Sequence, residues 1–252
     1  MIKRAKFLGV LITLLFYCCN TVFSVCAVSD LQTSYNGEIV LTDDENEAYF
    51  NSLSIEEQEK IKEKIHKALN IKKKSNFALK NNLDSVNASK ISIPGNFSIC
   101  HQENDYYCVP ACVRSMLMYI NGSSPSQSSI ASSLGTTSSD GTNPTTIAPY
   151  LNSKQNNCYY VYYASPTQSY LCDFLYFTIA YEECPASIGI SGANTSNWYY
   201  DASSHSLVVD AIYDDYSYIQ VSDPLAFAVS GCPDSYLRPA STVASLCTRV
   251  VY

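Results

Sequence analysis

The amino-acid sequence predicts an α+β protein in which an N-terminal helical half packs on an antiparallel sheet. Segments with helical periodicity come first along the chain, and segments rich in aromatic and β-branched residues come mostly later. Two of the late strands are joined by a short acidic turn, the connection expected between antiparallel neighbours. Because 46% of the 252 residues are hydrophobic, the chain can build a core of its own.

Residues 1–27 have the three-part layout of a secretory signal peptide. Three basic residues precede an apolar run over 7–17, and Val25, Cys26 and Ala27 offer a cleavage site. A retained anchor and lipidation of a cysteine in this segment are the alternatives. No later segment is apolar over about 18 residues. We therefore expect a secreted, extracellular protein that has no stable membrane insertion once the signal is removed.

Residues 28–90 form an acidic and helical N-terminal region that ends in a linker. Residues 28–53 are polar and acidic without a clear period, whereas 54–70 predict a helix that opens with a capping box of Ser54 and Glu57. Residues 71–90 are basic and rich in Asn, as is typical of a linker. The region is expected to be a spacer, a propeptide or a partner-binding helix.

Residues 91–252 are expected to form one globular domain. A short lead-in is followed by predicted helices over 108–121, 126–134 and 169–182, and a further short helix follows the loop near residue 140. Strands are predicted over 158–164, 185–191, 205–215 and 217–224.

The charge of this domain disfavours nucleic acid as a partner. Twelve acidic side chains and four basic ones give residues 91–252 a net charge of −8. Such a surface repels a phosphate backbone. A peptide or protein partner is compatible with it.

Cys108 stands where the helix over 108–121 is expected to begin. The positive end of a helix dipole favours the thiolate form of a cysteine, and Pro110 suits the first turn of a helix. Cys112, one turn later among apolar residues, is expected to be a core residue. A metal site made of Cys108, Cys112 and the adjacent Cys100 and His101 is disfavoured, because adjacent residues do not easily form a second ligand pair. We expect no cofactor and no metal.

A nucleophilic thiol needs a base, and the chain has three histidines. His205 begins a buried strand, and Asp223 ends the next one, so antiparallel pairing of the strands could bring the carboxylate to the imidazole. Asp210, Asp214 or Asp215 could take the place of Asp223. Gln102, six residues before Cys108, could act with the Cys108 N–H as a donor to an oxyanion.

The spacing of Gln102 and Cys108, followed by His205 in HSLVVDAIYDD and Asp223 in YIQVSDP, resembles the C39-like cysteine peptidases of the papain-like superfamily. The run CVPACVRSMLMYINGSSPSQSSIASSLGTTSSDGT is also similar to that family. The resemblance spans about residues 94–225. It implies a papain-like cysteine peptidase fold for the domain over 91–252. By the same resemblance, Cys108 would be the nucleophile, His205 the base and acid, Asp223 the residue that orients His205, and Gln102 the oxyanion donor.

The sequence thus predicts a secreted cysteine peptidase that hydrolyses peptide bonds. The resembled family often has Gly after the nucleophile, where this chain has Val109. This difference and the surplus of cysteines leave open a catalytically inactive, disulfide-stabilised binding module on the same fold. A papain-like amidase or acyltransferase with the same residues is a third hypothesis. If Cys108 and Cys112 are free, up to three disulfides are expected among the remaining cysteines, which are Cys100, Cys158, Cys172, Cys184, Cys232 and Cys247.

Overall fold

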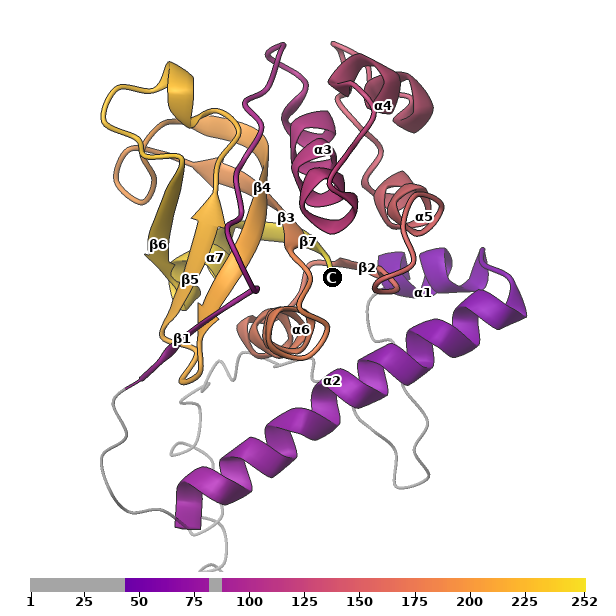
Figure 1. Ribbon diagram of the computed structural model, residues 1–252, viewed down its shortest axis with the longest axis vertical. Coiled ribbons are helices and arrows are strands. Elements are labelled where there is room, and N and C mark those ends of the chain that lie inside the picture. Colours follow the sequence, from indigo (N-terminus) through magenta and orange to yellow (C-terminus); the bar gives the residue numbers. More distant parts are fainter. Residues whose placement is uncertain (1–43, 82–87) are drawn as a thin grey trace, which may run out of the picture.

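A seven-stranded antiparallel sheet forms the centre of the structure, a computed structural model that describes residues 44–81 and 88–252, with side chains not described over 72–81 (Figure 1). The main path of the sheet runs β2-β7-β3-β4-β5-β6, and β1 pairs with the end of β4 that β3 leaves open. The strands are β1 (Lys90–Ser92), β2 (Tyr162–Ala164), β3 (Ala186–Ala193), β4 (Ala202–Tyr213), β5 (Tyr218–Ser222), β6 (Ser235–Pro239) and β7 (Cys247–Val251).

Helices cover both faces of the sheet. The helices are α1 (Asp44–Asn51), α2 (Ile55–Asn81), α3 (Cys108–Asn121), α4 (Gln127–Leu134), α5 (Ile147–Asn152), α6 (Gln168–Ala180) and α7 (Ala240–Leu246), with short 3-10 helices at Pro144–Thr146 and Ala226–Ala228. Alternate residues of β4 face opposite sides, as the period of a strand requires. Val208 packs in a core with α3, α4 and α5, whereas Leu207 and Val209 pack in a second core with α6 and α7.

The predicted α+β class is confirmed, and the helices predicted at 108–121, 126–134 and 169–182 are α3, α4 and α6. Of the strand predicted over 158–164, only 162–164 is a strand, which is β2. The segment before it is irregular, although the backbones of Val161 and Tyr252 exchange two hydrogen bonds. The prediction of a linker from residue 71 was wrong in part, since α2 continues to Asn81. The predicted signal peptide lies outside the described residues.

The N-terminal region packs on the domain through one face of α2. The capping box forms as predicted: the Ser54 N–H donates to Glu57 at 3.0 Å, and the Glu57 N–H donates to the Ser54 hydroxyl at 3.3 Å. Ile61, Ile65 and Ala68 are buried in the same core as α6. Figure 1 shows α2 crossing beneath α6.

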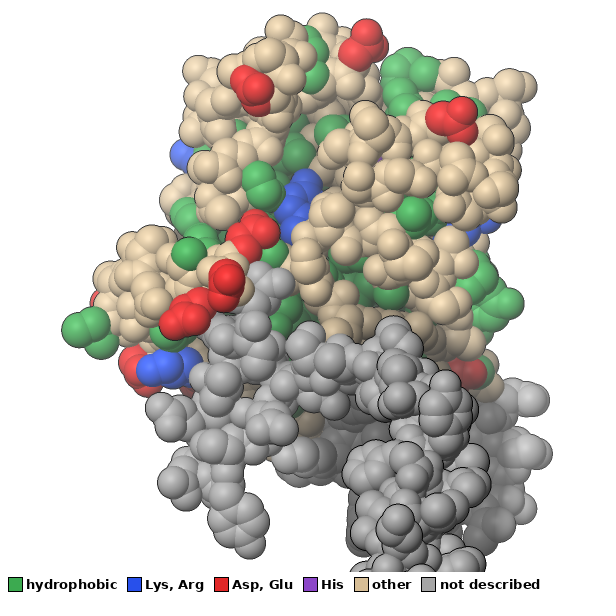
Figure 2. Space-filling view, turned by 180° about the vertical axis from the view of Figure 1, so that it is seen from behind, with side chains coloured by type: hydrophobic (Ala, Val, Ile, Leu, Met, Phe, Trp, Pro, Cys, Tyr) green, Lys and Arg blue, Asp and Glu red, His purple; other side chains and the backbone are tan. Residues whose placement is uncertain are grey.

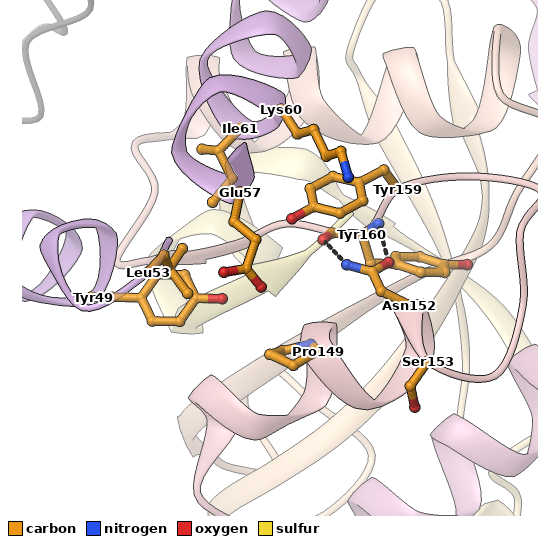
Figure 3. Close-up of a pocket in the computed structure, with 10 residues that line it drawn as sticks. All are labelled: Tyr49, Leu53, Glu57, Lys60, Ile61, Pro149, Asn152, Ser153, Tyr159 and Tyr160. Atoms are coloured by element: carbon orange, nitrogen blue, oxygen red, sulfur yellow. Dashed lines mark hydrogen bonds between the residues drawn. The ribbon is translucent and has the colours of Figure 1, made fainter. Parts of the chain in front are cut away.

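Lys64 is the buried charge of this contact. Its ammonium group donates to the Glu182 carboxylate at 2.6 Å and to the Tyr159 carbonyl at 2.7 Å. Near it, a pocket of about 260 Å³ lies between the α1–α2 region and α5, with Glu57 on one side and Pro149 on the other (Figure 3). The N-terminal region is therefore in direct contact with the helical half.

α1 protects an edge of the sheet. The Asn46 side chain, 3% exposed, accepts from the Ala164 N–H at 2.7 Å and donates to the Ala164 carbonyl at 3.1 Å. The amide thus replaces the backbone of a neighbouring strand on β2, the first strand of the sheet order. No helix within the described ranges is long and apolar enough to span a membrane.

The expected disulfides do not form among the described residues, where none of the eight cysteines is joined to another. The buried thiols are divided between two cores: Cys172 and Cys247 lie in one, and Cys112, Cys158 and Cys184 in the other. This division separates most potential partners. The exception is the pair Cys158 and Cys184, whose thiols share a hydrogen bond.

Candidate active site

Cys108 is the first residue of α3. The Tyr107 side chain makes no capping hydrogen bond with the first turn of this helix. Pro110 lies within the first turn, where its missing N–H costs nothing. The sequence therefore places a thiol at the positive end of a 14-residue helix, which favours the thiolate.

His205 on β4 and Asp223 just after β5 lie side by side. β4 and β5 pair antiparallel, with Val208 opposite Ser222. His205 Nε2 lies 2.9 Å from Asp223 Oδ1, and the two side chains are 5% and 0% exposed. Since Nε2 is occupied by the carboxylate, Nδ1 is left for the hydrogen bond that the ring makes with the Cys108 thiol.

Asp223 is held by four hydrogen bonds. Besides His205, the Leu225 N–H donates to Oδ1 at 2.9 Å, and the Tyr200 and Tyr236 hydroxyls donate to Oδ2 at 2.5 and 2.7 Å. Burial alone would raise the pKa of this carboxyl, but the bonds and charge of His205 and the two tyrosines lower it. A fixed, ionised carboxylate is the result.

The thiol and the imidazole shift each other's pKa in opposite directions. Burial would raise the pKa of Cys108, yet the hydrogen bond and charge of His205, with hydrogen bonds from Ser206, lower it overall. Burial would lower the pKa of His205, but Asp223 and Cys108 raise it to about 9. The site therefore favours a thiolate–imidazolium pair near neutral pH, which is the form a thiol nucleophile needs.

Gln102, the predicted oxyanion donor, is buried at 7% exposure. Its Nε2 donates to the Asn104 and Asp105 carbonyls at 3.0 and 3.3 Å, while Oε1 is buried without a partner. The Gln102 N–H donates to the Pro224 carbonyl at 3.0 Å, which ties this segment to the residue after Asp223. The side-chain amide thus fixes the loop that leads into α3.

The other residues considered from sequence lie elsewhere. The carboxylate of Asp210 accepts from Gln220 and Ser222, not from His205. His101 is partly exposed and pairs with Asp234 at 2.9 Å. Cys112 is fully buried, and burial raises the pKa of its thiol well above the ordinary value, in keeping with a core residue. The described residues contain no cluster of His, Cys, Asp and Glu able to hold a metal.

An open cleft of about 500 Å³ gives access to Cys108 and His205. The α3 end contributes Asp105 and Val109, the loop after α4 contributes Asp140, and the sheet contributes Gly189 and Arg249. Glu45 of α1 also borders the cleft, and the Tyr162 hydroxyl donates to it at 2.5 Å. On the face shown in Figure 2, a basic side chain lies in a depression with acidic side chains beside it. The cleft therefore exposes the thiol and the imidazole and has acidic residues at its border.

Sequence reasoning missed four residues of this site. Tyr200 and Tyr236 hold Asp223, and Ser206 and Arg249 lie beside Cys108. The only sequence signal for Tyr200 is that it forms a doublet with Tyr199. A weak signal for Ser206 was its place directly after His205, whereas Tyr236 and Arg249 lie on strands that were not predicted.

Comparison with solved structures finds similar chains among cysteine peptidases. A protein assigned as a C39-like peptidase from Bacillus anthracis has a TM-score of 0.45 and 14% identity, over 65% of this chain and 97% of that one. Xylellain, a cysteine protease from Xylella fastidiosa, has a TM-score of 0.44 and 14% identity, over 64% and 84%. The peptidase domain of Streptococcus ComA, a bifunctional ABC transporter of a quorum-sensing pathway, has a TM-score of 0.42 and 13% identity, over 62% and 97%. No protein-family model and no curated protein sequence matches the chain.

Proposed function

We propose that this protein is a secreted cysteine peptidase that uses Cys108 as nucleophile, His205 as base and acid, and Asp223 as the residue that orients His205. The observation that carries the proposal is the hydrogen-bonded series from the Cys108 thiol through the His205 ring to the buried Asp223 carboxylate, open to a cleft. A thiol paired with an imidazole and a carboxylate is the arrangement that nucleophilic acyl transfer requires.

In the proposed reaction, the Cys108 thiolate attacks the carbonyl carbon of the peptide bond. The negative charge moves to the carbonyl oxygen, where the Cys108 N–H donates, and Gln102 Nε2 donates after giving up one of its loop carbonyls. Imidazolium of His205 then protonates the leaving amine as the C–N bond breaks. His205 next takes a proton from water, which attacks the thioester, and the acid product leaves with the thiol restored.

Secretion is part of the proposal and rests on the signal-like segment over 1–27. N-terminal sequencing of the protein from the culture medium of an expressing cell tests it. A mature chain that begins near residue 28 supports secretion, and a chain that retains Met1 in the cell opposes it.

The function is tested with a peptide library incubated with wild type, Cys108→Ala and Cys112→Ala. We expect cleavage by wild type and by Cys112→Ala, and none above background by Cys108→Ala. Cys112 is the matched control because it lies one turn later in α3 but is buried away from the cleft. Cleavage that survives Cys108→Ala would refute the assignment. Turnover of amide or ester compounds but of no peptide would replace peptidase with amidase or acyltransferase.

A further inference from the structure

Arg249 is a buried cation without a carboxylate partner. It lies on β7 at 6% exposure, and no described acidic side chain forms an ion pair with it. Its Nη2 donates to the Ser206 hydroxyl at 2.5 Å, whereas Nη1 is buried and has no hydrogen-bond partner. A buried charge is costly unless an opposite charge or several hydrogen bonds compensate it.

The sheet register directs Arg249 toward the site. Arg249 on β7 lies opposite Gly189 on β3, and Gly189 lies opposite Ser206 on β4. The guanidinium crosses β3 over this glycine, since a Cβ atom at position 189 would be 2.2 Å from Nη1 and 2.7 Å from Cζ. Glycine at this position is therefore a steric condition for the contact between Arg249 and Ser206.

Ser206 joins the guanidinium to the nucleophile. Its hydroxyl accepts from Arg249, and both its hydroxyl and its N–H make hydrogen bonds with the Cys108 thiol. The ionisable groups that act most strongly on Arg249 are the Cys108 and Cys112 thiols, followed by Cys247 and Tyr162. Of the Cys108 and Cys112 thiols, Cys112 is held neutral by burial, so the Cys108 thiolate is the anion available to this cation.

We propose that Arg249 is a positioning residue that, through the Ser206 hydroxyl, stabilises Cys108 as a thiolate. The proposal rests on the proposed function, because it assigns a second cationic support to the same nucleophile. Arg249 orients the Ser206 oxygen by donating to it, which leaves the hydroxyl hydrogen free to point at sulfur. The positive charge is then separated from the thiolate by one hydroxyl group, and both Arg249 and Ser206 are buried, at 6% and 2% exposure.

Other charged groups also face the thiol. His205 on β4 acts on it directly, and Asp223 after β5 is bonded to His205 on the far side of the ring. Cys112 of α3, one turn away, is held neutral by burial. Asp105, Asp140 and Glu45 border the cleft and are solvated. The contribution of Arg249 is separable from theirs because changes at positions 189, 206 and 249 leave all of them in place.

The test measures the rate at which iodoacetamide alkylates Cys108 as a function of pH, with peptide mass spectrometry to follow this cysteine alone. Loss of the cation makes the thiolate harder to form, so the acidic limb of the profile should move to higher pH in Arg249→Met. At a pH below the limb we expect a rate about tenfold lower than in wild type, the effect of one pKa unit. At a pH above the limb, the two rates should converge.

Three further variants separate this role from a structural one. Arg249→Lys keeps the charge and should recover part of the loss. Ser206→Ala keeps the cation but removes the connecting hydroxyl, and about a threefold fall is expected, half of a pKa unit. Gly189→Ala keeps both groups but forces the guanidinium aside, and its limb should move in the same direction. If Arg249→Met does not fold, the last two variants decide the matter.

The inference is overturned if the acidic limb stays in place in Ser206→Ala and Gly189→Ala, or if rates change equally at every pH. Because alkylation needs no substrate, its outcome is independent of the peptide library. Peptide cleavage together with an unmoved limb refutes the role of Arg249 alone. If the acidic limb of the alkylation profile moves but no peptide is cleaved, the proposed peptidase function is refuted, whereas the role of Arg249 in stabilising the thiolate is supported.

Discussion

Replacing Lys64 with Met tests whether the N-terminal region is an integral part of the fold. The Lys64 side chain is 5% exposed, and its Nζ bonds both Glu182, at 19% exposure, and the Tyr159 carbonyl. It also lies 5.1 Å from the centre of the Tyr252 ring. Met keeps most of the apolar length of the side chain but leaves the carboxylate and the carbonyl without their donor.

The expected cost follows from this burial. Removing one partner of a buried ion pair costs about 3–5 kcal/mol. Glu182 is partly exposed and regains some hydration, so we expect a loss of about 2–3 kcal/mol in the free energy of unfolding. At roughly 2–4 °C for each kcal/mol, the melting temperature should fall by about 4–12 °C.

Urea unfolding followed by tryptophan fluorescence measures this loss, because Trp198 is the single tryptophan and is buried in the core that also contains Ile65. Lys67→Met on the same helix is the matched control: Lys67 is 59% exposed, and its bond to Glu63 is a surface pair, so unfolding should not change measurably. The double variant Lys64→Met with Glu182→Gln should recover part of the loss. Equal unfolding midpoints for Lys64→Met and wild type would refute the docking of α2 on the domain.

Four further results are expected. Tyr236→Phe removes one hydrogen-bond donor to Asp223 and should lower the free energy of unfolding by about 1.5–3 kcal/mol at neutral pH. Because the pKa of Asp223 is lowered in the fold, this loss should be present above about pH 4 and shrink below it. A loss that is the same at every pH would contradict the argument. The pKa of His205 is raised from 6.5 to about 9, so protonated His205 should contribute fully to the free energy of unfolding below pH 6.5, and this contribution should be lost as the pH rises through 9. If the difference in the free energy of unfolding between wild type and His205→Gln does not change over this pH range, the argument is contradicted. Cys158 and Cys184 should form a disulfide under mild oxidation, and closing this loop should raise the free energy of unfolding by roughly 3 kcal/mol, whereas Cys172 should stay reduced. Peptide mapping of the oxidised protein that finds Cys158 and Cys184 still as thiols would exclude the pairing. Asn46→Ala should lower the free energy of unfolding by about 1–3 kcal/mol through its two lost bonds to Ala164, and a thermal melt like that of wild type would show that α1 is not held there.

The sequence predicted the central contact of the site because that contact depends on local signals. A helix start at Cys108 follows from residue types within a few positions, and the meeting of His205 and Asp223 follows from two consecutive strands with a short turn. These are short-range relations, and the pairing of neighbouring strands is the commonest one. The roles assigned to the residues remain predictions that the peptide library tests.

Contacts between residues on strands that are distant in the chain could not be predicted from local sequence patterns. Arg249 reaches Ser206 only because β7 lies beside β3, and these two strands are separated in the chain by five other elements. No local sequence pattern predicts such a pairing. The same holds for Tyr236, whose strand was not predicted, and for Asn46, which lies in a segment without a clear period. The linker prediction failed at 71–81 because basic and Asn-rich composition argues for solvent exposure, which a helix satisfies as well as a coil.

The Asn46 amide also limits how this protein can be trimmed. It occupies the free hydrogen-bonding groups of Ala164 on β2, and an uncovered sheet edge is a template for pairing with another chain. A protease cut before Asp44 keeps this cover in place, whereas a cut after α1 would open the edge and one after α2 would also bare the contact surface of Ile61 and Ile65. Shortened forms that begin before Asp44 should self-associate no more than the full chain does, whereas forms that begin after Asn81 should self-associate through their strands.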